Sequence, residues 1–257
     1  MPRGYHTSPL DSLSIPGPLY SAQILRVGFT HPQPDGSVRA DGSVTLLHGG
    51  PLTVLVDTGG PWLRPHLPGL LNAHGVTPDD VTHVVVTHGH SDHAGNLNLF
   101  PRATLLVGFD LSRGEGLYLP NGLAQGVPWV LHPGHLQVTP TPGHTRAHVS
   151  LVALGTSLGT VAVWAALSED PPEQRRSRRS LVATADVIVP GHGGPFRVLK
   201  DGGDIGDRRE DTLGDMGTPS RDTGTALEVA PRDMGTMLGT PGHGGHGDTI
   251  GGGPEGR

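Results

Sequence analysis

Three histidines and one aspartate lie close together in the segment His-Gly-His-Ser-Asp-His at 88–93. Imidazole nitrogens and carboxylate oxygens are ligands that Zn²⁺ and related divalent metals accept in proteins. A chain with 16 histidines in 257 residues readily produces isolated histidines, but it rarely concentrates them in this way. The H-x-H-x-D-H pattern therefore predicts a metal site that includes His88, His90, Asp92 and His93.

A short apolar strand is expected to position this cluster. Residues 81–87 are rich in valine and lead directly into His88. Alternate side chains of an extended segment point the same way, so His88 and His90 can direct two imidazoles at one point. Asp92 and His93 follow where the chain must turn, and they can reach a neighbouring point.

Two further histidines lie in tight turns after predicted strands. His144 is part of Pro-Gly-His-Thr at 142–145, and His192 is part of Pro-Gly-His-Gly at 190–193. Pro-Gly turns place short loops at strand ends, which is also the setting of the first cluster. Seven other histidines lack such a motif, and we interpret them as packed or surface groups: His48, His66, His74, His83, His132, His135 and His148.

The composition limits the kind of protein. Gly (41) and Pro (25) are abundant, which is typical of a chain with many turns, short strands and few long helices. Cysteine is absent, so any metal must be held by nitrogen and oxygen. We expect short strands through most of the body, a broken helix near 62–74, and a helix from Ser168, as its N-cap, towards Ala185.

Charge and composition change near residue 200. Residues 1–200 carry 13 acidic and 13 basic groups, whereas 201–257 carry 11 acidic and 5 basic groups. A neutral body has no overall attraction for nucleic acid, so RNA binding would need a local patch. The arginines of 175–179 could form one, although acidic residues just before them explain the run equally well as a solvated helix. We predict an N-terminal extension at 1–18, one domain at 19–200, and a disordered Gly-rich acidic tail at 201–257.

The order H-x-H-x-D-H, P-G-H-T, P-G-H-G resembles the metallo-β-lactamase superfamily over roughly residues 20–200. The resemblance implies an α/β (α+β four-layer) fold, the αβ/βα sandwich, with the metal site at one edge. By position, it implies that His88, His90 and His144 hold a first metal, and that Asp92, His93 and His192 hold a second. Asp57 matches an early aspartate that supports the ligand loop from behind.

Residues 38–46, 57–62, 87–96 and 166–171 narrow the resemblance to one branch of the superfamily. That branch implies an intracellular endoribonuclease, with Zn²⁺ as cofactor, that cleaves the 3′ end of histone pre-mRNA. Asp92 would then orient the attacking water, a catalytic role, while it also binds the second metal. We accordingly expect a soluble protein of the cytoplasm, with the nucleus as a second compartment, an RNA substrate and no membrane partner. A homodimer is left open.

One departure from the family pattern affects the second metal. The superfamily places a Gly-Asp pair after the strand that follows P-G-H-T, and its carboxylate bridges the metals. Here residues 159–166 lack that pair, as if a segment were missing. We expect up to two zinc ions, the second more weakly held. Glu169 or Asp170 could replace the aspartate, but helix capping also explains both residues.

Two alternatives to the nuclease therefore stay open. A thioesterase of the glyoxalase II type would use the same ligands. A metal-binding protein with little catalysis would follow if the missing carboxylate is essential.

Overall fold

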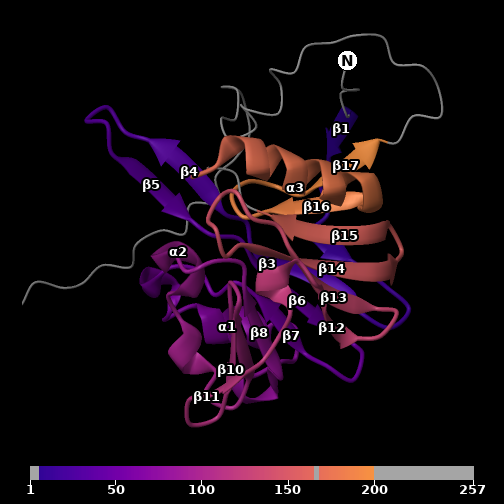
Figure 1. Ribbon diagram of the computed structural model, residues 1–257. Coiled ribbons are helices and arrows are strands. Elements are labelled where there is room, and N and C mark those ends of the chain that lie inside the picture. Colours follow the sequence, from indigo (N-terminus) through magenta and orange to yellow (C-terminus); the bar gives the residue numbers. More distant parts are fainter. Residues whose placement is uncertain (1–5, 165–167, 200–257) are drawn as a thin grey trace, which may run out of the picture. The chain divides into compact units, whose positions relative to one another are not determined.

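The computed structural model describes residues 6–164 and 168–199. Within this part of the chain the strands form two large sheets and one separate hairpin (Figure 1). The helices are short except for α3 (Pro171–Thr184), and the others are α1 (Leu67–Asn72), α2 (Ser91–Ala94), η1 (Pro61–Leu63), η2 (Pro78–Asp80), η3 (Leu97–Leu99) and η4 (Leu123–Gln125).

The first sheet has eight strands, and its centre is parallel. β7 pairs in parallel with β8, and β8 pairs in parallel with β9, so the carboxyl ends of these three strands lie at one edge. In spatial order the strands are β11 (Leu117–Leu119), β10 (Asp110–Arg113), β9 (Thr104–Val107), β8 (His83–Val86), β7 (Val54–Val56), β6 (Val44–His48), β3 (Ser21–Arg26) and β2 (Ser14–Ile15).

The second sheet has seven strands, with one parallel pair between β15 and β16. In spatial order the strands are β1 (His6–Pro9), β17 (Phe196–Leu199), β16 (Val187–Pro190), β15 (Gly159–Trp164), β14 (Val149–Thr156), β13 (Leu136–Pro140) and β12 (Trp129–His132). A hairpin of β4 (Phe29–Pro32) and β5 (Val38–Asp41) projects from the sheets (Figure 1).

The buried side chains show that the two sheets pack face to face between helices. Val85 of β8 and Leu151 of β14 belong to one apolar cluster, so the inner faces of both sheets meet there. Val84, one residue away, points to the opposite face and packs with Leu67 of α1. Ile188 of β16 likewise packs outward against Leu181 of α3. This is the predicted αβ/βα sandwich of four layers, because alternation along each strand supplies both faces.

The chain leaves the first sheet between β3 and β4 at Gly28, where a Cβ atom would lie 2.3 Å from the carbonyl oxygen of Gly191. The structure also corrects the predicted start of the helix that runs towards Ala185. Ser168 is not the N-cap of α3. Asp170 takes that position and accepts a hydrogen bond from the Glu173 backbone N–H, since Pro171 and Pro172 have no N–H to offer.

The structure describes part of the predicted N-terminal extension but none of the predicted C-terminal tail. The proposed extension at 1–18 contains β1, which pairs with β17, and β2, which pairs with β3, so these residues are part of the sheets. The predicted disordered tail at 201–257 lies outside the described residues. The segment 108–126 contains the antiparallel strands β10 and β11.

Candidate metal centre

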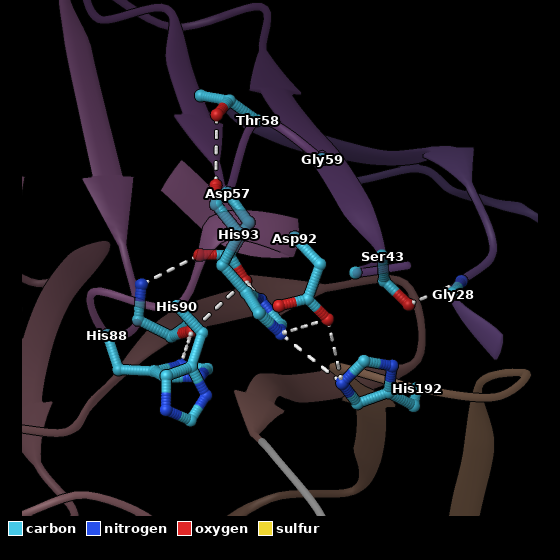
Figure 2. A network of polar contacts seen from close by, with 12 residues as sticks. Gly28, Ser43, Asp57, Thr58, Gly59, His88, His90, Asp92, His93 and His192 are labelled. Carbon is cyan, nitrogen blue, oxygen red and sulfur yellow. Dashed lines mark hydrogen bonds and ion pairs between the residues drawn. The ribbon is translucent and has the colours of Figure 1, made fainter. Parts of the chain in front are cut away.

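The six predicted ligands lie in two groups at the edge where the parallel strands end. Figure 2 labels all of them except His144. His88 follows β8, and His192 follows β16. The candidate ligand atoms of His88, His90 and His144, here called the first ligand group, all lie within 4.8 Å of one another. Those of Asp92, His93 and His192, the second ligand group, do so as well. Their role as metal ligands stays a prediction, while their convergence is a property of the fold.

In the first ligand group the nitrogens converge on His88 Nε2. This atom lies 2.9 Å from His90 Nδ1 and 2.9 Å from His144 Nε2. The other nitrogen of the same ring, His88 Nδ1, lies 3.0 Å from the Thr87 hydroxyl. Because that hydroxyl donates to Asp57, its oxygen accepts the Nδ1 proton of His88. The lone pair of His88 is therefore on Nε2, where a cation would be bound.

Hydrogen bonds at Nδ1 also orient the two histidines of the second ligand group. His192 Nδ1 lies 3.1 Å from the carbonyl oxygen of Phe29 and 3.0 Å from that of Asp41. Carbonyl oxygens only accept hydrogen bonds, so Nδ1 of His192 carries the proton and Nε2 is free. His93 Nδ1 lies 2.7 Å from Asp57, which leaves its Nε2 only 3.3 Å from that of His192.

Asp92 completes the second ligand group. One of its carboxylate oxygens lies 3.7 Å from His93 Nε2 and 3.5 Å from His192 Nε2. Figure 2 shows the carboxylate of Asp92 facing both rings. The side chain of Asp92 is 17% exposed and that of His192 is 11% exposed, whereas that of His93 is fully buried, so Asp92 is the most exposed member of the group.

Asp57 connects the two ligand groups. Its buried carboxylate accepts hydrogen bonds from the Thr87 backbone N–H at 2.7 Å, from the Thr87 hydroxyl at 3.1 Å, and from His93 at 2.7 Å. Asp57 also has a φ of 58°, the only positive value among the described non-glycine residues. Such strain persists only where surrounding contacts hold the backbone, and it is concentrated at functional sites.

Asn96 holds the loop that directly follows Asp57 and was not predicted from the sequence. Its buried amide donates to the carbonyl oxygens of Thr58 and Gly60, each at 2.8 Å. Thr58 in turn donates its hydroxyl to the carbonyl oxygen of His93 at 2.9 Å. Asn96 therefore fixes the loop after Asp57 against the loop of ligands. The only signal in the sequence is its place just after the cluster.

Asp41 is a second supporting residue that sequence reasoning missed. Its buried carboxylate accepts from the Gly60 backbone N–H at 2.8 Å and from the Trp62 indole at 3.0 Å. Because its carbonyl oxygen also accepts from His192, Asp41 connects the end of β5 to the second ligand group.

Comparisons with known proteins agree with this geometry. Residues 39–109 match the family model of the metallo-beta-lactamase superfamily. The chain is 51% identical to metallo-beta-lactamase domain-containing protein 1 of Xenopus laevis, over 77% of this chain and 90% of that protein. It is 47% identical to the protein of the same name from Homo sapiens, over 76% of this chain and 90% of that protein. The chain belongs to the metallo-beta-lactamase superfamily.

More distant metallo-beta-lactamase proteins share the fold. A putative metallo-beta-lactamase from Thermotoga maritima has a TM-score of 0.53 at 20% identity, covering 70% of this chain and 99% of that one. Hydroxyacylglutathione hydrolase of Anaeromyxobacter dehalogenans is 34% identical, over 59% of this chain and 61% of that protein. Superfamily members are generally metal-dependent hydrolases, and we describe this chain as such. No helix in the described part of the chain is long and apolar enough to cross a membrane.

The charges of the metallo-beta-lactamase site suit a divalent cation. Burial, together with the neighbouring imidazoles, lowers the pKa of His88, and burial with His93 nearby lowers that of His192. Both rings are thus neutral, which is the form of histidine that binds a metal ion. Burial alone would lower the pKa of His93 too, but Asp57, Asp92 and Asp41 outweigh it and raise that pKa. His93 would then release a proton when a metal binds.

The donor set also fits zinc chemistry. The first ligand group offers three imidazoles, and the second offers two imidazoles and one carboxylate. Three protein ligands with an open position are typical of catalytic zinc. Neither Glu169 nor Asp170 belongs to either group of described ligands. The carboxylate of Asp170 caps α3 instead, and the backbone N–H of Glu169 donates to the carbonyl oxygen of His144 at 3.1 Å.

The histidines and arginines that lie outside the two ligand groups make contacts of their own. His83 lies against Trp129, with ring centroids 6.1 Å apart, and is in neither ligand group. His148 was interpreted as an ordinary packed group, yet it lies beside the site, with its ring 5.3 Å from that of His88. In the predicted arginine run, Arg176 pairs with Glu173, as expected for a solvated helix.

Proposed function

We propose that this chain is a zinc-dependent hydrolase that cleaves RNA, as an endoribonuclease acting on the 3′ end of histone pre-mRNA. The observation that supports hydrolysis most strongly is the sharing of Asp57: one buried carboxylate orients histidines of both ligand groups. The RNA substrate is supported by the resemblance in 38–46, 57–62, 87–96 and 166–171. We further propose that the chain acts in the cytoplasm, with the nucleus as a second compartment. Whether it forms a homodimer is a separate question, which a measurement of its mass in solution would answer.

In this proposal His88, His90 and His144 would hold one zinc ion, and Asp92, His93 and His192 a second. A bound zinc ion would act as a Lewis acid and lower the pKa of a water molecule to about 7. Asp57 keeps the Nε2 lone pair of His93 directed into the site, and through Thr87 it does the same for His88. The partly exposed carboxylate of Asp92 would accept a hydrogen bond from the attacking water and orient it.

Hydrolysis of a phosphodiester then needs little more from the protein. The water oxygen bonds to phosphorus, the bond from phosphorus to the leaving ribose oxygen breaks, and the leaving oxygen takes up a proton. Asp92 is the described residue placed to accept the proton that the water loses. We propose that the second ligand group binds its ion more weakly than the first. Among the described residues Asp92 is the only carboxylate in either ligand group, and 165–167 are outside the described part.

Metal content and RNA cleavage test this proposal together. Mass spectrometry of the purified chain should find one tightly bound zinc, with a second retained only at higher free zinc. A labelled histone pre-mRNA 3′ end should be cut by the zinc-loaded protein, and His88→Gln should abolish the cutting. Protein that binds no zinc would contradict the hydrolase, and two tightly bound ions would contradict the weaker second group.

A thioesterase of the glyoxalase II type is the second candidate. It is favoured by the 34% identity to hydroxyacylglutathione hydrolase of Anaeromyxobacter dehalogenans. The same protein preparation should be given a glutathione thioester alongside the RNA. Turnover of the thioester without RNA cleavage would replace the nuclease by the thioesterase. Zinc binding without turnover of either substrate would favour a metal-binding protein that lacks the carboxylate needed for catalysis.

A further inference from the structure

A groove beside the first ligand group carries features that neither the ligands nor the comparisons account for. It has a volume of about 720 Å³, which is in the range of ligand sites in proteins. Pro142, Arg146 and Ala147 form one wall, and they belong to the loop that also carries His144. Phe109 and Leu123 contribute apolar side chains to the lining.

The groove lies next to the site because of the strand order. Phe109 follows β9, which pairs in parallel with β8, the strand that ends just before His88. The loop of His144 is fixed against the same strands, since the backbone N–H of Val149 donates to the carbonyl oxygen of Thr87 at 2.9 Å. A molecule in the groove would therefore contact the loop that supplies a ligand of the first group.

The two chemical halves of the lining match the two halves of a nucleotide. The ring of Phe109, which is only partly buried, offers an apolar surface on which a planar base can stack. Leu123 is 1% exposed and belongs to the apolar cluster against which Phe109 packs. Arg146 and Arg176 offer guanidinium groups that suit phosphate oxygens. Arg146 is exposed and makes no hydrogen bond or ion pair with another described residue.

The polar lining has one group of the opposite charge. Glu173 also lines the groove, and its carboxylate pairs with Arg176 on the next turn of α3. Ser177 uses its hydroxyl to donate to the carbonyl oxygen of Pro142 at 2.7 Å, so it holds α3 against the loop. Arg146 is thus the cation free for an anionic ligand, and Glu173 opposes such a ligand.

We propose that this groove binds a nucleotide of single-stranded RNA next to the scissile phosphate, with its base against Phe109 and a phosphate on Arg146. The proposal rests on the proposed function for the choice of RNA. Charge complementarity and the apolar surface carry the choice of a nucleotide over an uncharged acyl group.

Binding should be measured separately from cleavage. The probe is a short fluorescent oligoribonucleotide with phosphorothioate linkages, titrated into the zinc-loaded full chain at several salt concentrations. Arg146→Gln should weaken binding about tenfold, as expected for loss of a charged hydrogen bond, and should lower the salt slope by about 0.7. Phe109→Leu keeps an apolar side chain but removes the ring, and should weaken binding about fivefold or more.

Two further variants make the test specific. Arg175→Gln removes one positive charge, as Arg146→Gln does, but Arg175 lies on α3 and does not line the groove, so its effect should be much smaller. Glu173→Gln should tighten binding about two- to fivefold, because it removes the opposing charge and frees Arg176. Unfolding temperatures close to that of the wild type confirm that each variant is folded.

Three results would overturn the inference, and a fourth would separate it from the proposed nuclease. If Arg146→Gln and Arg175→Gln lower the RNA affinity equally, the oligomer is held by the general positive charge of the surface and not by the groove. If the oligomer does not bind at all, RNA is excluded as the ligand. Uridine monophosphate that competes as tightly as the oligomer would assign the groove to free nucleotides instead. RNA that binds through the groove without being cut would contradict the proposed nuclease and leave the groove assignment intact.

Discussion

The carboxylate of Asp57 lies 2.7 Å from Nδ1 of His93, and both side chains are fully buried. The same carboxylate accepts the hydroxyl proton of Thr87, whose oxygen faces Nδ1 of His88. One residue outside both ligand groups thus sets which nitrogen is free in a histidine of each group. Partners of this kind typically change metal affinity by 10- to 100-fold when they are removed.

Replacement of Asp57 by asparagine should therefore lower the affinity of both ligand groups for zinc without unfolding the loop. Asparagine tolerates the positive φ of this position better than most residues, so the backbone can stay in place. We expect the zinc affinity of the second ligand group to fall by about 10- to 100-fold, and that of the first to fall less. The pKa of His93 should also drop, since burial would no longer be outweighed by the Asp57 charge. Competition with a zinc chelator and NMR titration of His93 measure the two effects.

Asp110→Asn is the matched control for that variant. Asp110 is an exposed carboxylate on β10 of the same sheet, and no described ligand contacts it. Its replacement should leave the zinc affinity unchanged. Wild-type zinc affinity in Asp57→Asn would show that the ligand geometry does not depend on this carboxylate.

Gly42 tests how closely the second ligand group is packed. A Cβ atom there would lie 2.6 Å from the carbonyl oxygen of Asp92 and 2.9 Å from Nδ1 of His93. Gly42→Ala should displace the His93 ring from Asp57. The zinc affinity of the second ligand group should then fall about tenfold or more, while that of the first ligand group stays unchanged. Zinc titration followed by mass spectrometry under native conditions resolves the two bound states.

Gly69→Ala is the control, because a Cβ atom at Gly69 in α1 would meet nothing within 4 Å. That change should stabilise the protein by about 0.5–1 kcal/mol, as expected for glycine to alanine in a helix, and leave zinc binding unchanged. Weakening of the first metal as much as the second in Gly42→Ala would argue against a local effect.

Asn96 should contribute to stability as well as to the site. Asn96→Ala leaves the buried carbonyl oxygens of Thr58 and Gly60 without their amide donor. Each unsatisfied buried group costs about 1–3 kcal/mol, so the loss of two donors should lower the free energy of unfolding by about 2–6 kcal/mol. Urea denaturation of the metal-free protein measures it.

Asn98→Ala provides the comparison, because Asn98 accepts its hydrogen bond from Arg64 on the exposed surface. Its cost should be below about 1 kcal/mol. Equal costs at the two positions would mean that the loop after Asp57 is held by other contacts.

These residues show what the sequence could and could not predict. The candidate ligands of 88–93 could be picked out because their spacing is local, although their role stays a prediction, and the four-layer sandwich followed from the family motifs. Asn96 and Asp41 were not, because each acts on backbone groups far away in the chain, and no local spacing reports such contacts. The cap of α3 was placed at Ser168, whereas the structure uses Asp170, since two consecutive prolines shift the first free N–H to Glu173.

His148 predicts how stability depends on pH in the metal-free protein. Its side chain is buried beside the ligands, its Nδ1 lies 3.0 Å from the Thr141 hydroxyl, and its Nε2 has no partner among the described residues. Burial, with the neighbouring His144 and His93, lowers the pKa of His148 to about 3. In the unfolded chain a histidine has a pKa of about 6.5, so the unfolded state binds a proton first as the pH falls.

The stability that His148 contributes is therefore fully present above about pH 6.5 and is lost as the pH falls towards about 3. Its share of the slope is at most about 1.4 kcal/mol per pH unit, the value for one proton. His148→Asn should remove that share, so the free energy of unfolding in EDTA should vary less steeply with pH than in the wild type. His31→Gln, at an exposed histidine of the β4–β5 hairpin, should keep the wild-type slope. Equal slopes for His148→Asn and the wild type would show that His148 titrates in the folded protein as it does in the unfolded chain.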